Sequence, residues 1–146
     1  MDIIINVAEA HKSQLRDSDI AHEIESVQDY ISNFQGVFPE NQICFMFIKG
    51  YYNHQERAMR SACLFVNRLS APIKELHGEV RLRFTDRDGI IAKMTVDFNE
   101  EFMGTLESNH ALLVHVGIPV KGLKEDSVVN SSEVSGDFDS IRVTFV

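Results

Sequence analysis

The chain has 146 residues, 44% of them hydrophobic and 25% charged, with a formal net charge of −8. That length is typical of one domain with its own core, and that composition excludes a chain that is disordered throughout. We therefore expect a single domain over residues 1–146. The net acidity disfavours non-specific binding to nucleic acid or to an anionic membrane, so direct nucleic-acid binding is not expected.

Neither a membrane segment nor an export signal is predicted. The longest apolar run, 43–48, is far shorter than the ~20 residues that a bilayer span requires, and the run at 3–5 is shorter still. Asp2 stands where a signal peptide would carry positive charge. Both cysteines, Cys44 and Cys63, lie in apolar runs, where a cysteine behaves as a small buried hydrophobe. We expect two free thiols, and the predicted location is the reducing cytoplasm.

The first half of the chain predicts strands alternating with helices. Residues 2–8 form a short β-branched apolar run, and residues 42–49 form an apolar, aromatic run that predicts a strand covered on both faces. Two stripes at helical spacing predict helices over 19–35 and 54–70. The stripes consist of Ile20, Ile24, Val27, Ile31 and Phe34, and of Met59, Ala62, Cys63, Val66 and Leu69.

Local signals support the second helix. Asn53, followed three residues later by Glu56, resembles a capping box at its start, and Pro72 should end it near Ser70. A short further turn is expected through Ile73 and Leu76.

From residue 80 onward the apolar period changes to two. Half-buried strands are predicted over 80–85 and 92–98, with further strands over 111–120 and 141–146. Residues 121–140 predict a long polar loop, interrupted by a weak strand at Val128 and Val129. The predicted fold class is α+β, in which two main helices pack on a mixed, mainly antiparallel sheet of five or six strands, in the order β-α-β-α-β-β-β-β.

The segment TDRDG, residues 85–89, resembles the opening of a calcium loop. The further oxygen ligands and the closing glutamate that such a loop requires are missing, so no metal site is predicted. A three-residue hairpin loop of Arg87, Asp88 and Gly89 fits better, because it places glycine where φ is positive and sets Phe84 opposite Ala92. The same register sets Val80 opposite Val96.

That register also places bases on one outer face of the hairpin. Arg83 faces Lys93, and Arg81 lies two residues along. Like charges facing each other across strands are destabilising unless an acid lies over them. Either Asp97 and an acidic helix of the same chain neutralise these bases, or they form an exposed basic ribbon, continued by Arg57 and Arg60, for an acidic protein, a phosphate or a nucleotide.

No catalytic constellation is recognisable in the sequence. The six histidines lack zinc spacing, and the nucleophile elbow and the glycine-rich phosphate loops do not occur, so neither catalytic residues nor a cofactor is predicted. One alternative ligand site is the anion-accepting start of the second helix, with Tyr51, Tyr52 and His54. His115, within an apolar strand, is either a core residue or part of that site.

These observations favour a non-enzymatic protein-interaction module, an adaptor or inhibitor, that binds another protein through a charge-patterned surface. A version of this hypothesis is an acidic mimic of nucleic acid that uses the first helix, with Asp19, Glu23, Glu25 and Asp29. One alternative is a binding protein or small enzyme for a nucleotide or phosphate at residues 51–60. Another is a homo-oligomer that pairs through an exposed edge strand such as 141–146.

Overall fold

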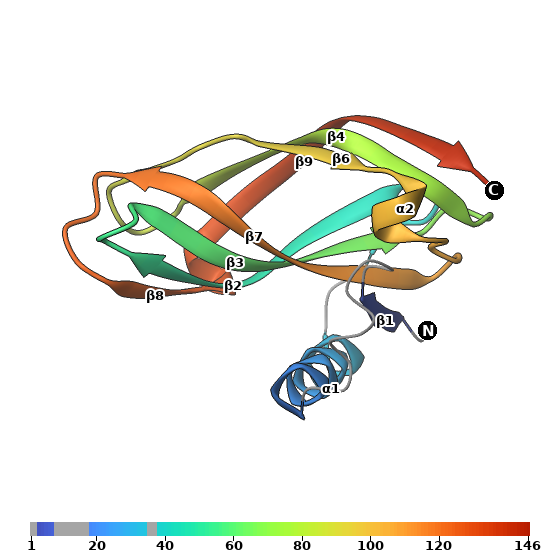
Figure 1. Ribbon diagram of the computed structural model, residues 1–146, viewed down its shortest axis with the longest axis horizontal. Helices are drawn as coiled ribbons and strands as arrows, with labels where there is room; N and C mark the ends of the chain where they lie inside the picture. Colours follow the sequence, from blue (N-terminus) through green and yellow to red (C-terminus); the bar gives the residue numbers. More distant parts are fainter. Residues whose placement is uncertain (1–2, 8–17, 35–37) are drawn as a thin grey trace.

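The protein is mainly β. A computed structural model describes residues 3–7, 18–34 and 38–146, with the backbone alone at residues 18–21. Two β-sheets pack face to face, and α1 (Ser18–Ser32) lies against the outer face of the larger sheet (Figure 1). The predicted α+β fold is therefore wrong, since only one of its two main helices is present.

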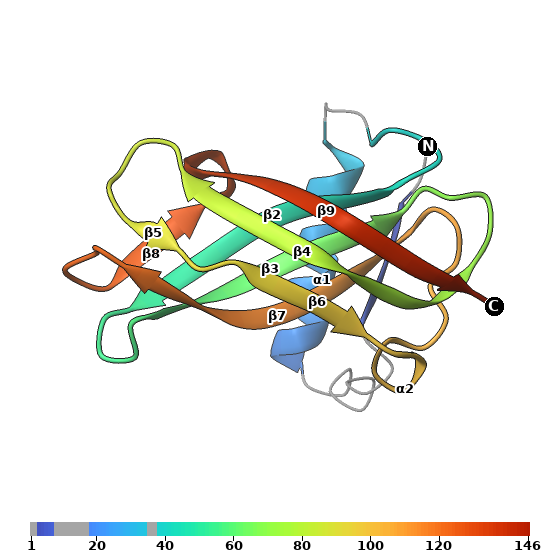
Figure 2. The same cartoon turned by 90° about the horizontal axis from the view of Figure 1, so that it is seen from above.

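The larger sheet carries most of the strands. Its order is β1-β7-β3-β2-β8, and β5 pairs with β7 beside this path (Figure 2). The pairing of β1 with β7 is parallel, and the other pairings are antiparallel. The strands are β1 (Ile4–Val7), β2 (Ile43–Asn53), β3 (Ala58–Asn67), β5 (Ile90–Ile91), β7 (His110–Lys121) and β8 (Ser127–Asn130).

The smaller sheet is antiparallel, with the order β6-β4-β9. Its strands are β4 (Ile73–Phe84), β6 (Met94–Phe98) and β9 (Val134–Phe145). The short helix α2 (Glu100–Met103) follows β6, and a 3-10 turn (Ser131–Glu133) joins β8 to β9.

Two apolar cores hold these layers together. The first lies between the sheets and includes Phe65, Leu76 and Val80. The second lies between α1 and the larger sheet and includes Val27, Ile31 and Leu64. Because β3 contributes to both cores, its apolar side chains on both faces are removed from water.

This double burial explains why the predicted helix over 54–70 is wrong. In β3, Cys63 and Phe65 enter the core between the sheets, whereas Leu64 and Val66 enter the core under α1. A strand buried on both faces has a nearly continuous apolar run, and such a run contains residues at helical spacing by chance. Both cysteines are free, as expected, and burial raises the pKa of Cys63 to about 12.

The second half of the chain needs three corrections. The turn expected through Ile73 and Leu76 is the start of β4, and the loop expected over 121–140 contains β8 and most of β9. The predicted hairpin register is wrong by two residues, because Val80 pairs with Met94 and not with Val96. Residues 90–91 pair with β7 in the other sheet, so the ladder between β4 and β6 ends at Val80 and Met94 and the predicted three-residue hairpin loop does not form.

Candidate functional site

The bases predicted to form an exposed ribbon are ion-paired on the outer face of the smaller sheet. Arg83 lies opposite Ser135 of β9, not opposite Lys93. Lys93 Nζ lies 3.0 Å from Glu79 Oε1, and Arg81 contacts both Glu79 Oε2 at 3.0 Å and Asp139 Oδ2 at 2.7 Å. The hydrogen bond from Lys93 is the main cause that lowers the pKa of Glu79.

The acids that neutralise this face come from β4 and β9. Arg83 is paired with Asp137 of β9 at 3.3 Å, in the same way that Arg81 is paired with Asp139. Asp97, which the sequence suggested as a partner of Arg81, instead lies beside His77, with its Oδ1 atom 2.7 Å from His77 Nδ1. A face with this many paired charges offers little unbalanced positive charge to a partner.

Arg57 and Arg60 lie away from those bases, at the hairpin between β2 and β3 in the other sheet. Arg60 contacts Glu56 at 3.4 Å in an exposed position. The five bases therefore do not share one surface.

Of the acids expected on the first helix, Glu23 has a defined partner. Its Oε1 atom lies 2.7 Å from His115 Nε2, so His115 is neither a core residue nor part of the site near Tyr52. Glu25 and Asp29 are exposed. The side chain of Asp19 lies outside the described residues.

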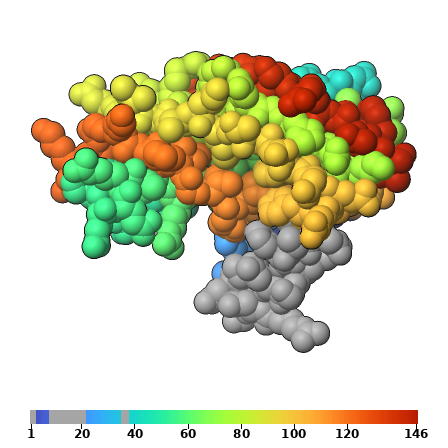
Figure 3. All heavy atoms as spheres, turned by 45° about the horizontal axis from the view of Figure 1, so that its top comes forward, coloured from blue at the N-terminus to red at the C-terminus, as the bar shows by residue number. Residues whose placement is uncertain are grey.

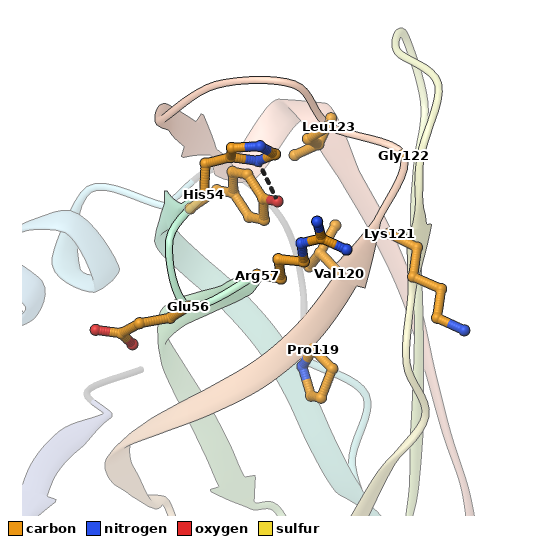
Figure 4. A pocket seen from close by; sticks show the side chains of 9 residues that line it. His54, Glu56, Arg57, Pro119, Val120, Lys121, Gly122 and Leu123 are labelled. Carbon is orange, nitrogen blue, oxygen red and sulfur yellow. Dashed lines mark hydrogen bonds between the residues drawn. The ribbon is translucent and has the colours of Figure 1, made fainter.

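The alternative ligand site coincides with a pocket at one end of the sandwich (Figure 4). The pocket has a volume of about 630 Å³, within the range of roughly 300–1,000 Å³ usual for small-molecule sites. The hairpin turn at residues 54–57 forms one side, and the end of β7 with the loop that follows it forms the other. In Figure 3 this hairpin, in green, projects from the body of the molecule beside the orange segment.

Hydrogen bonds tie the two sides of the pocket together. The backbone N–H of His54 donates to Asp126 Oδ1 at 2.8 Å, and the N–H of Val120 donates to the carbonyl of Arg57 at 3.1 Å. The hydroxyl of Tyr52, a residue that is 1% exposed, is hydrogen-bonded to His54 Nδ1 at 3.1 Å. The pocket is thus built from fixed elements.

Arg57 supplies the charge of this pocket. Its guanidinium extends into the space below His54 and Leu123, whereas Glu56 and Lys121 point away on opposite sides (Figure 4). Among the side chains that the structure describes, neither Arg57 nor Lys121 forms an ion pair. The backbone of Arg57 has a φ of 54°, the left-handed region that costs a residue with a Cβ about 1–2 kcal/mol.

Gly89, the last residue of the TDRDG segment, packs against one rim of the pocket. Gly122, in the loop after β7, has a φ of 92°, and a Cβ added there would lie 3.1 Å from the Cα of Gly89. Gly89 has a positive φ of 133°, so this position does require glycine, although the predicted three-residue hairpin is not formed. The two glycines let the loops pack closely and fix one rim of the pocket.

The sequence identified only part of this site. Tyr52, His54 and Arg57 come together, but Tyr51 lies on the opposite face of β2, in register with Arg60. The missed residues are those at the end of β7 and in the loop that follows it, from Pro119 to Leu123. The pairing of Ala58 with Pro119 brings them to the hairpin, and that pairing cannot be foreseen while β3 is taken for a helix.

These features define a β-sandwich with a ligand-sized pocket at one end. Comparison with known protein families, curated proteins and solved structures finds no match to this chain. In the described part of the chain, no group of three potential ligand side chains could hold a metal ion. Over the same residues, no helix has both the length and the hydropathy to cross a membrane.

Proposed function

We propose that the protein is a non-enzymatic binding domain that recognises an anionic group in the pocket at the end of the sandwich. The observation that carries this proposal is the Arg57 guanidinium, which extends into the pocket without an ion-pair partner among the described side chains. The ribbon bases Arg81, Arg83 and Lys93 support binding less well, because acids of the same chain are paired with them.

The chemistry of the pocket is suited to holding a ligand by its charged end. A guanidinium presents planar donors that match a carboxylate or a phosphate group with two parallel hydrogen bonds. Pro119 and Leu123 add accessible apolar surface to the pocket lining, and Val120 and the ring of Tyr52 lie buried behind them. A few directed polar groups in an otherwise apolar pocket are typical of ligand sites.

The anionic group could belong to a free small molecule or to another protein. An acidic side chain or a chain end of a partner presents the same chemistry, and in this form the proposal includes a protein-interaction module. A free small molecule must bind through the pocket alone, whereas an acidic group on a partner protein can be supported by contacts outside the pocket.

Thermal unfolding with added ligand tests this proposal. A ligand at 100 times its Kd stabilises the folded state by about 2.7 kcal/mol. Acetate, inorganic phosphate and adenosine monophosphate form one arm, and a peptide rich in glutamate forms the other. At least one probe should raise the Tm of the wild type and leave that of Arg57→Asn unchanged.

Arg60→Asn is the matched control, since Arg60 lies on the same hairpin but does not line the pocket. This variant should respond to the probe as the wild type does. A response confined to the peptide arm would assign the site to a partner protein. Absence of any shift, or an equal shift in Arg57→Asn, would contradict the proposal.

Self-association through β9 is a second candidate function. This strand forms one edge of the smaller sheet, and Ile141 and Phe145 are 37% and 51% exposed. An uncovered edge with apolar side chains can pair with a second copy. Light scattering should then report a dimer that Ile141→Lys dissociates, and a monomer at every concentration would exclude this candidate.

A further inference from the structure

We propose that the pocket is selective for a carboxylate that is attached to an apolar body, in preference to a phosphate. This inference rests on the proposed function and names the ligand class of the same site. It follows from the number of cations that enter the pocket, from an acid near it and from the chemistry of its walls.

The positive charge inside the pocket matches a monoanion. Arg57 extends into the space, whereas Lys121 points away from it (Figure 4). One guanidinium can bind a carboxylate through two parallel hydrogen bonds. A phosphate monoester carries a charge of about −1.5 to −2 at pH 7, so a single guanidinium leaves part of that charge unbalanced.

An acidic side chain near the pocket adds to this preference. Glu56 points away from the pocket, as Lys121 does. Asp126, however, accepts the backbone N–H of His54 at 2.8 Å. Because Coulomb repulsion is proportional to charge, its carboxylate repels a dianionic phosphate about twice as strongly as a monoanionic ligand. The hydroxyl of Tyr52 is already hydrogen-bonded to His54 Nδ1 at 3.1 Å and adds no charge.

The walls favour an apolar body behind the charged end. Leu123 is half-buried and Pro119 is exposed, so these two residues supply the accessible apolar surface, with Val120 and the ring of Tyr52 buried behind them. Each methylene that such walls remove from water strengthens binding by up to about fourfold. A ligand with a short alkyl or aryl body should therefore bind more tightly than acetate.

Titration calorimetry on the full chain with probes of equal length tests the inference. The probes are hexanoate, hexyl phosphate and hexylamine. Acetate and inorganic phosphate serve as references that lack the hexyl chain. We expect hexanoate to bind at least about tenfold more tightly than hexyl phosphate and than acetate, and hexylamine not to bind. Arg57→Asn should weaken hexanoate binding at least about tenfold, Arg57→Lys should weaken it less, and Arg60→Asn should leave it unchanged.

The outcomes separate the inference from the proposed function. If hexyl phosphate binds as tightly as hexanoate or more tightly, and Arg57→Asn abolishes that binding, the carboxylate preference is wrong and the anion site stands. If neither anion binds, or if both bind Arg57→Asn as they bind the wild type, the inference and the proposed function fail together. Circular dichroism of each variant shows whether a loss of binding reflects a loss of folding.

Discussion

The side-chain oxygen of Asn53 accepts a hydrogen bond from the backbone N–H of Glu56 at 3.2 Å. At the start of a helix, a capping side chain accepts the same kind of hydrogen bond from the N–H three residues further on. Here the bond closes the hairpin turn between β2 and β3. An asparagine side chain that satisfies a turn N–H stabilises the turn, and its loss typically costs about 1 kcal/mol.

We therefore expect Asn53→Ala to lower the free energy of unfolding by about 1 kcal/mol. Gln55→Ala is the control, because it changes an exposed residue in the same turn. Urea denaturation measures both. Equal stability of Asn53→Ala and Gln55→Ala would show that the bond does not support the turn.

Arg57 occupies a backbone position that favours glycine. With its φ of 54°, a change to glycine removes the cost of a Cβ in the left-handed region. Arg57→Gly should raise the free energy of unfolding by roughly 0.5–1 kcal/mol while abolishing anion binding. Arg60→Gly, within β3, should lower it, because glycine weakens a strand interior. Destabilisation by Arg57→Gly would mean that the arginine side chain itself holds the turn.

Two glycines near the end of β7 form a second matched pair. Gly122 has a φ of 92° and lies against Gly89, whereas a Cβ added to Gly117 would meet no atom within 4 Å. Gly122→Ala should therefore destabilise the fold by about 1–2 kcal/mol and distort the pocket rim. Gly117→Ala should be neutral or slightly stabilising. Similar unfolding curves for the two variants would contradict the packing of the two loops.

The ion pairs on the smaller sheet predict a pH effect. The pKa of Glu79 is lowered chiefly by the hydrogen bond from Lys93. A carboxyl whose pKa is lower in the folded state stabilises the fold above its unfolded pKa, and this contribution is lost as the pH falls through the folded pKa. The difference in stability between the wild type and Glu79→Gln should be present at pH 7 and shrink below the ordinary value of 4.5.

Urea denaturation between pH 3 and pH 7 measures that difference. It should also shrink at high salt, because the charges are exposed and therefore screened. A difference that is the same at all these pH values would contradict the ion-pair explanation.

Sequence patterns predict several of the elements. The stripe of α1 predicts a helix over 19–35, and the structure has Ser18–Ser32. One face of this helix carries the apolar residues, so the helical period is readable. A strand is also predicted over 111–120, and β7 is His110–Lys121, although its apolar residues enter both cores.

Sequence patterns fail in β3 and in β9, for two different reasons. In β3 both faces are buried, so the spacing that predicts a helix has no meaning there. In β9, Asp137 and Asp139 make the segment read as a loop, although they are paired with Arg83 and Arg81 of the adjacent strand. The side of the pocket formed by the end of β7 was missed because it depends on the pairing of β3 with β7. That pairing is not foreseen when β3 is predicted to be a helix.

Chemical-shift mapping of the amide resonances during a titration with hexanoate shows where the anion binds. We expect the perturbed amides to cluster at residues 52–57 and 120–123, and the perturbations to disappear in Arg57→Asn but to persist in Arg60→Asn. Perturbations centred on Arg81, Arg83 and Lys93, or none at all at saturating hexanoate, would contradict binding in the pocket.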